Sequence, residues 1–168
     1  MNFRTSSINH AAMAAAGLES IHVANLLILA NYLAALPENY EHFDMGVFIT
    51  TDESEPVPSM VTEDVLHRCG TVACAVGHGP AAGIAPKQGQ YWWGYLTNFT
   101  GGEENSFDDN IYLQLFDDDW SIVDNTTKGA AARIYHFLAH GLSNLDLDDF
   151  EEMEHLMEQA YQYVGESV

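Results

Sequence analysis

The residues best suited to chemistry lie in one short segment, Arg68 to Gly83, which contains both cysteines of the chain. Cys69, Cys74 and His78 follow one another there among glycines and alanines. A thiol and an imidazole about one helical turn apart can serve as packing groups, as metal ligands, or as a nucleophile and its base. The first question is therefore which of these roles the surrounding elements allow.

Three interpretations of these side chains stay open. The sequence favours packing, because a free cysteine usually behaves as a small buried apolar group. In a zinc site, Cys69 and Cys74 would be joined by His136 and His140 from a later predicted helix. In a thiol-dependent enzyme centred on Cys69, Cys74 and His78, a helix N-terminus would lower the pKa of a thiol and a histidine would take its proton. A disulfide is disfavoured, since cysteines five residues apart at a helix start rarely meet.

The element expected to position these side chains is a helix. Gly70 and Thr71 are predicted to begin it, with the Thr71 hydroxyl capping the first turn, and helical spacing continues to His78. Alanines and glycines along this segment would let another backbone approach closely. Pro80 is expected to end or kink the helix.

The central block also carries a family resemblance. Its pattern is Cys69-Gly70-Thr71-x-x-Cys74-x-x-Gly77-His78, with an aromatic segment and an Ala-Ala-Arg-Ile helix after it. This arrangement resembles a group of small bacteriophage and bacterial proteins of unassigned function, over residues 25 to 140. The resemblance implies an origin in a phage or another mobile element, and it brings no activity, ligand or partner with it.

Length and composition predict one domain spanning residues 1–168. The chain has 168 residues, of which 47% are hydrophobic, enough for a core without disulfide or metal staples. Residues 1–18 are rich in small and polar residues and in alanine, so we expect a flexible or loosely docked N-terminal segment. With only two cysteines and no evident targeting segment, we expect a reducing, cytoplasmic location.

The charge is strongly one-sided. The chain has five Lys and Arg residues and 25 Asp and Glu residues, which gives a formal net charge of −20. Such a chain is not expected to bind nucleic-acid phosphates or anionic membranes directly, whereas a basic protein surface would suit it. A host that lives at high salt would explain the same acidity without a partner. Arg133, one of the few cations, is expected to pair with a carboxylate inside the fold.

Hydrophobic periodicity predicts four longer helices. The first, at 20–36, is apolar nearly all round and should be a buried central helix. The others are expected at 107–120, at 126–140 with a threonine cap and Gly141 as its end, and at 146–164. A short strand is predicted at 45–50, and the aromatic segment 91–99 is assigned to core packing in preference to a binding surface.

The acidity concentrates in residues 103–168, which hold 16 acids and 2 bases. Three consecutive aspartates sit poorly at the predicted helix C-terminus, where the dipole disfavours negative charge. A second group surrounds the start of the last helix. The candidate binding residues are Asp117, Asp118, Asp119, Asp148, Asp149, Glu151 and Glu152.

These inferences predict a mainly α, single-domain bundle of about six helices with one short strand pair. The favoured function is an acidic interaction protein, phage-derived, that binds a basic surface of a host protein as an inhibitor or nucleic-acid mimic and needs no cofactor. The alternative is a metal-binding protein, with zinc as cofactor, or a thiol-dependent enzyme built on the central block. The sequence indicates no oligomeric state.

Overall fold

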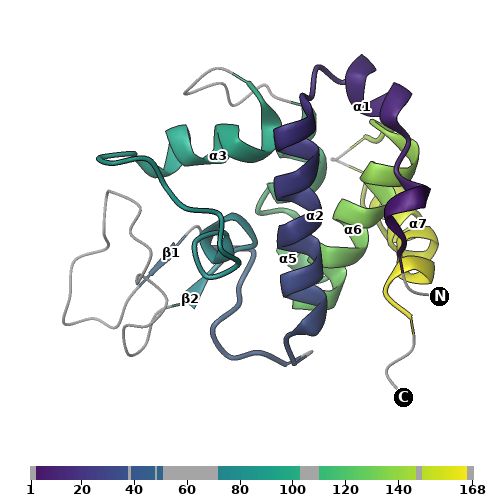
Figure 1. Ribbon diagram of the computed structural model, residues 1–168. Coiled ribbons are helices and arrows are strands. Elements are labelled where there is room, and N and C mark those ends of the chain that lie inside the picture. The colour runs from purple at the N-terminus through teal and green to yellow at the C-terminus, as the bar shows by residue number, and fades with distance from the viewer. Residues whose placement is uncertain are drawn as a thin grey trace.

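The computed structural model describes residues 3–37, 39–47, 49–50, 72–102, 110–146 and 149–165. This part of the chain is mainly helical, as predicted (Figure 1). Its α-helices are α1 (His10–Ala15), α2 (Ser20–Ala35), α3 (Trp92–Thr100), α4 (Asn110–Phe116), α5 (Trp120–Val123), α6 (Thr127–His140) and α7 (Phe150–Ala160). The remaining elements are β1 (Ile49–Thr50), β2 (Val72–Ala73) and the 3-10 turns η1 (Thr5–Ser7), η3 (Val76–His78) and η4 (Tyr161–Tyr163). None of the described helices combines the length and the apolar character that crossing a membrane requires.

Helices α2 and α6 form the centre of the molecule. They pack against each other, α3 lies against α2, and α7 lies against α6 (Figure 1). The ends of α6 are as predicted. Thr126 accepts a hydrogen bond from the Gly129 N–H at 2.9 Å, and Gly141 ends the helix with a φ of 84°.

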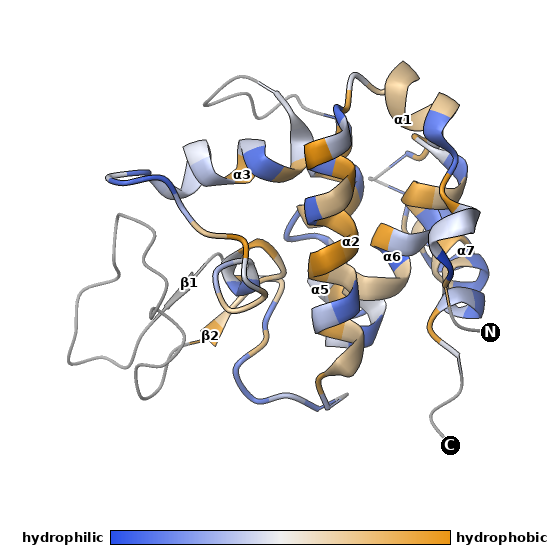
Figure 2. Ribbon diagram, viewed as in Figure 1, coloured by the Kyte–Doolittle hydropathy of each residue, from blue (hydrophilic) through white to orange (hydrophobic). Residues whose placement is uncertain are grey.

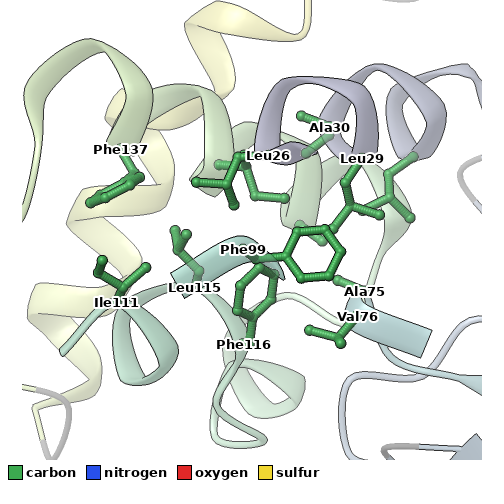
Figure 3. Close-up of a cluster of buried hydrophobic side chains, with 14 of the residues drawn as sticks. Leu26, Leu29, Ala30, Ala75, Val76, Phe99, Ile111, Leu115, Phe116 and Phe137 are labelled. Atoms are coloured by element: carbon green, nitrogen blue, oxygen red, sulfur yellow. The ribbon is translucent and has the colours of Figure 1, made fainter. Parts of the chain in front are cut away.

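The core gathers side chains from both halves of the chain (Figure 3). Leu26 and Leu29 of α2 face Phe99 of α3 and Phe116 of α4, all of them buried. The Phe99 and Phe116 rings meet edge to face with centroids 5.9 Å apart, a favoured aromatic geometry. Tyr95 and Phe99 are 0% exposed, which confirms core packing for that part of the aromatic segment, whereas Tyr91 at its start is 60% exposed.

The central block does not form the predicted helix. Val72 and Ala73 instead pair antiparallel with β1, with Ile49 opposite Ala73, and the helical turn that follows is the short η3. A Cβ added at Gly79 would overlap the Tyr95 hydroxyl, so this glycine makes room for aromatic side chains of α3. The helix prediction is wrong because pairing with a distant segment overrides local spacing.

The predicted helix at 107–120 is also divided. In the described residues, α4 ends at Phe116 and α5 begins at Trp120, with the three aspartates between them. The Asp119 N–H donates to the Asp117 carboxylate at 3.0 Å, a local side-chain bond that competes with the helical ladder. The aspartates therefore form a connecting turn and do not extend a helix.

The described N-terminal residues pack against α6 and the C-terminal turn. Phe3 stacks on Tyr135 of α6 with ring centroids 4.6 Å apart, and its N–H donates to the Tyr163 carbonyl at 3.1 Å. The Asn9 N–H donates to the Leu138 carbonyl at 2.8 Å. Alanine-rich α1 follows and buries Met13.

Candidate functional site

Cys74 follows β2, His78 ends η3, and both side chains lie in the interior. The Cys74 side chain is buried, and burial raises the pKa of its thiol to about 11. Burial also lowers the pKa of His78 to about 4, although its Nε2 lies 3.2 Å from the His42 carbonyl oxygen. A reactive cysteine needs a lowered thiol pKa, and the histidine that takes its proton needs an imidazole pKa that is not lowered. These surroundings therefore favour packing for the two side chains, and Cys69 lies outside the described residues.

Aromatic rings surround His78. Its ring centroid lies 5.7 Å from that of Phe43, 5.8 Å from Tyr40 and 6.2 Å from Tyr32. Within the described residues, the His78 Nδ1 atom has no hydrogen-bond partner. A neutral imidazole in an apolar cage is a packing group, which agrees with the favoured interpretation of the block.

The histidines proposed as further zinc ligands lie on α6 and point toward the C-terminal turn. The rings of His136 and His140 are 4.6 Å apart, and the His140 Nε2 lies 2.7 Å from the Tyr163 hydroxyl. Among the described residues, Cys74 does not join them in a group of three ligand atoms at metal-binding separation. The zinc alternative thus has no assembled ligand set in this part of the chain.

The three aspartates between α4 and α5 do come together. Asp117, Asp118 and Asp119 offer carboxylate oxygens within 4.8 Å of one another. Burial raises the pKa of Asp117, and its two neighbouring carboxylates add to the rise. Burial, with a contribution from Asp117, raises the pKa of Tyr112 to about 12. The triplet therefore concentrates negative charge that a nearby cation would relieve.

A hollow of about 620 Å³ opens beside the triplet. Asp117 and Asp119 line one side of it, and the chain that follows α6 lines the other. Gln114 holds the two sides together, because its side-chain amide donates to the Ser143 hydroxyl and its Oε1 accepts from the Ser143 N–H at 3.2 Å. The lining residues are Asn110, Leu113, Gln114, Asp117, Asp119, Leu142, Ser143, Asn144, Leu145 and Asp146.

A second hollow of about 580 Å³ continues from the first. Its lining residues are His136, Ser143, Asn144, Leu145, Asp149, Glu151, Glu152, His155, Leu156 and Gln159. Residues 143–145 belong to both hollows. We call the combined surface, from Asp117 to Glu152, the acidic groove.

The start of α7 forms the acidic wall of the second hollow. The Asp149 carboxylate caps the helix by accepting from the N–H groups of Glu151 and Glu152. Three acids at a helix N-terminus are stabilised by the helix dipole, so the fold tolerates this density of charge. The Glu152 carboxylate also accepts from the Asp146 N–H at 3.0 Å, which fixes the connecting chain.

Two histidines also line the second hollow, His136 on α6 and His155 on α7. His136 is 7% exposed, and its pKa is lowered by burial and by neighbouring His140. His155 is exposed, and its Nε2 atom lies 2.9 Å from the Nε2 atom of Gln159. Near neutral pH the buried His136 imidazole is neutral and adds no positive charge to the groove.

The structure brings most of the sequence-predicted binding residues to one surface. Asp117, Asp119, Asp149, Glu151 and Glu152 line the acidic groove, and Asp118 lies next to it in the triplet. Asp148 lies outside the described residues. Sequence patterns do not predict Gln114 or residues 143–145, because no periodic or charge signal marks a polar contact between separate segments of the chain.

Arg133 departs from its expected pairing with a carboxylate. The side chain is 1% exposed, and its guanidinium carbon lies 4.5 Å from the centroid of the Trp120 ring, a cation–π contact. Its Nη1 lies 3.9 Å from the Met157 sulfur, whereas Nε and Nη2 have no hydrogen-bond partner in the described structure. Burial lowers the pKa of Arg133 to about 10, and Asp124 partly offsets this.

Comparisons of this chain with protein-family models, with curated proteins and with solved structures found no match. The resemblance of the Cys69–His78 block to small phage proteins remains a prediction.

Proposed function

We propose that this protein binds a basic segment of a partner protein in the acidic groove. The observation that carries the proposal is the convergence of two acidic clusters, separated in sequence by α6, on one hollowed surface. Asp117 and Asp119 stand at one end, and Asp149, Glu151 and Glu152 stand at the other. Lysine and arginine side chains of a partner would neutralise both ends.

Charge supports this choice of partner. Neither hollow has a lysine or an arginine among its described lining residues. A concave surface of one charge sign focuses the field and accelerates the arrival of an oppositely charged partner. The same field repels a phosphate backbone, so the proposal excludes direct nucleic-acid binding.

Apolar side chains between the acids support an amphipathic ligand. Leu113, Leu142 and Leu145 line the first hollow, and Leu156 lines the second. Such a floor contacts leucine-like side chains, or the methylene stems of lysine and arginine, between the charged positions. The ligand we propose alternates basic and apolar residues, unlike a simple polycation.

The biological setting follows from the resemblance and stays a proposal. A small acidic protein of phage origin would act in the host cytoplasm, against a basic protein surface that normally contacts nucleic acid. Occupying that surface would make it an inhibitor or nucleic-acid mimic. The described residues favour no second function, since the Cys74 thiol and the His78 imidazole are buried.

The test is fluorescence anisotropy with a labelled peptide of repeated Gly-Lys-Leu-Arg units. We expect saturable binding that weakens steeply between about 0.05 and 0.5 M salt. A second peptide, with serine in place of leucine and the same charge, should bind more weakly because it cannot use the apolar floor.

Two substitutions of equal charge on α7 provide the matched comparison. Glu151 lines the groove and Glu154 does not, although both are exposed. Glu151→Gln should weaken peptide binding about threefold, the effect expected of one exposed charge pair, and Glu154→Gln should change it far less. Absence of binding at low salt, or equal effects of the two substitutions, would overturn the proposal.

A further inference from the structure

Helix α2 exposes an apolar stripe away from the acidic groove. Ile21 is 56% exposed and Ile28 is 43% exposed, large values for side chains of this type. Alternating spacings of three and four residues connect the exposed positions Ile21, Ala24, Ile28, Asn31 and Ala35. This is the a and d spacing with which one helix packs against another. We call these five residues the α2 seam.

The α2 seam is free of charge on a very acidic chain. Residues 20–35 contain no Asp, Glu, Lys or Arg, whereas the whole chain has a net charge of −20. Figure 2 shows much of α2 in the apolar colours, on a helix that crosses the front of the molecule. A basic partner would gain nothing from this face. A second copy of the chain can meet it without placing carboxylates against carboxylates.

The sizes of the side chains suit two antiparallel copies of the same helix. A two-fold axis near Ile28 would place Ile21 of each copy opposite Ala35 of the other, so that a large side chain meets a small one. Asn31 is already oriented, because its Oδ1 accepts from the Tyr135 hydroxyl at 2.8 Å. Large side chains packed against small ones allow the close approach that a helix pair needs.

We propose that the α2 seam is the interface of a homodimer with two-fold symmetry. Helix α6 lies between α2 and α7, so the dimer leaves both acidic grooves accessible (Figure 1). A pair of 16-residue helices forms an interface at the small end of the range for specific complexes. We expect a reversible dimer, with a dissociation constant of about 1 to 100 µM.

The test is sedimentation equilibrium of the full chain at about 1 to 300 µM. Two protomers that each carry −20 repel one another, so added salt should strengthen the dimer. Salt should weaken peptide binding to the groove, so the two proposals respond with opposite signs. A chain that stays monomeric at every concentration, or a dimer that salt dissociates, would overturn the interface.

Two exposed isoleucines supply a matched pair of variants. Ile28 lies in the α2 seam, and Ile122 on α5 is 67% exposed outside it. Ile28→Glu should raise the dissociation constant at least about tenfold, because it places a carboxylate at the centre of an apolar contact. Ile122→Glu adds the same charge and should leave the constant within about twofold.

Circular dichroism and peptide anisotropy separate loss of the dimer from loss of the fold. We expect Ile28→Glu to keep native ellipticity and to bind the Gly-Lys-Leu-Arg peptide as well as the unaltered chain does. Equal weakening of the dimer by the two glutamate variants would overturn the α2 seam while leaving the proposed function in place.

Discussion

Cys74 and His78 lie in the interior among aromatic rings, whereas the acids of the groove line two hollows open to solvent. Burial suppresses ionisation in the first region: the thiol holds its proton and the imidazole stays neutral. In the second region, negatively charged carboxylates lie close together on one surface. Titratable side chains in the same small fold thus serve packing in one place and, in the function we propose, recognition in the other.

The contrast predicts opposite responses to substitution. Changes in the central block should lower the free energy of unfolding and leave peptide binding intact. Changes in the acidic groove that keep its capping and connecting hydrogen bonds, such as Asp117→Asn, should weaken peptide binding and leave stability equal or higher. A single variant that reverses this assignment would remove the distinction.

The largest effect is expected from His78. Its folded-state pKa of about 4 lies below the ordinary value of 6.5, so the unfolded chain binds the extra proton between these values. The contribution of neutral His78 to stability is complete above about pH 6.5 and is lost as the pH falls toward 4. Linkage puts this loss at about 3 kcal/mol.

The measurement for His78 is urea unfolding at several pH values between 7 and 4. Carboxylates titrate near the lower end as well, so His78→Phe provides the reference, with an apolar ring in the same aromatic cage. The unaltered chain should lose about 3 kcal/mol more than the variant over this range. Parallel pH curves would show that His78 is solvated and the cage open.

Cys74→Ser should have the next largest effect. It replaces a buried thiol with a hydroxyl that prefers a hydrogen-bond partner, so we expect a loss of about 1 to 2 kcal/mol in the free energy of unfolding. Cys74→Ala, which adds no polar group, is the control and should cost less. Loss of peptide binding in a folded Cys74→Ser protein would contradict the packing role and revive the thiol alternative.

The smallest change in the free energy of unfolding is expected at Asp117, where the substitution should stabilise the protein. The raised pKa means that ionised Asp117 opposes folding at neutral pH, while Asn can still accept the Asp119 N–H. Because the site is half-exposed and screened, Asp117→Asn should stabilise the protein by no more than about 0.5 kcal/mol. The same variant should weaken peptide binding. Thermal unfolding and peptide anisotropy on one sample test the expected gain in stability and the expected loss of binding. A loss of stability would contradict the inference that ionised Asp117 opposes folding.

The parts of the fold that the sequence predicts well depend on local signals. Thr126 and Gly141 mark the ends of α6, and apolar spacing places α2 and α7. The helix prediction for the central block was wrong because Thr71 resembles a helix cap and helical spacing follows it. Its strand pairs with residues 49–50, and no local pattern shows that distant segment.

The candidate site was predictable in its charges but not in its shape. Runs of Asp and Glu identified Asp117, Asp149 and their neighbours. The hollow between them depends on Gln114 reaching Ser143 and on the path of residues 143–145, which are tertiary contacts between unrelated segments. The exposed side of α2 was missed for a related reason. A helix that is apolar nearly all round is predicted to be buried on every side. Hydrophobic periodicity cannot distinguish a face that packs in the core from an apolar face that is exposed.

Trp120 gives the molecule an internal optical probe. Its ring packs against the Arg133 guanidinium on α6, and its Nε1–H donates to the Leu113 carbonyl on α4 at 3.2 Å. Both helices contribute to the acidic groove, so a ligand that shifts one relative to the other changes the polarity around the indole. Intrinsic tryptophan emission can then follow occupancy of the groove without a label, in the unaltered protein.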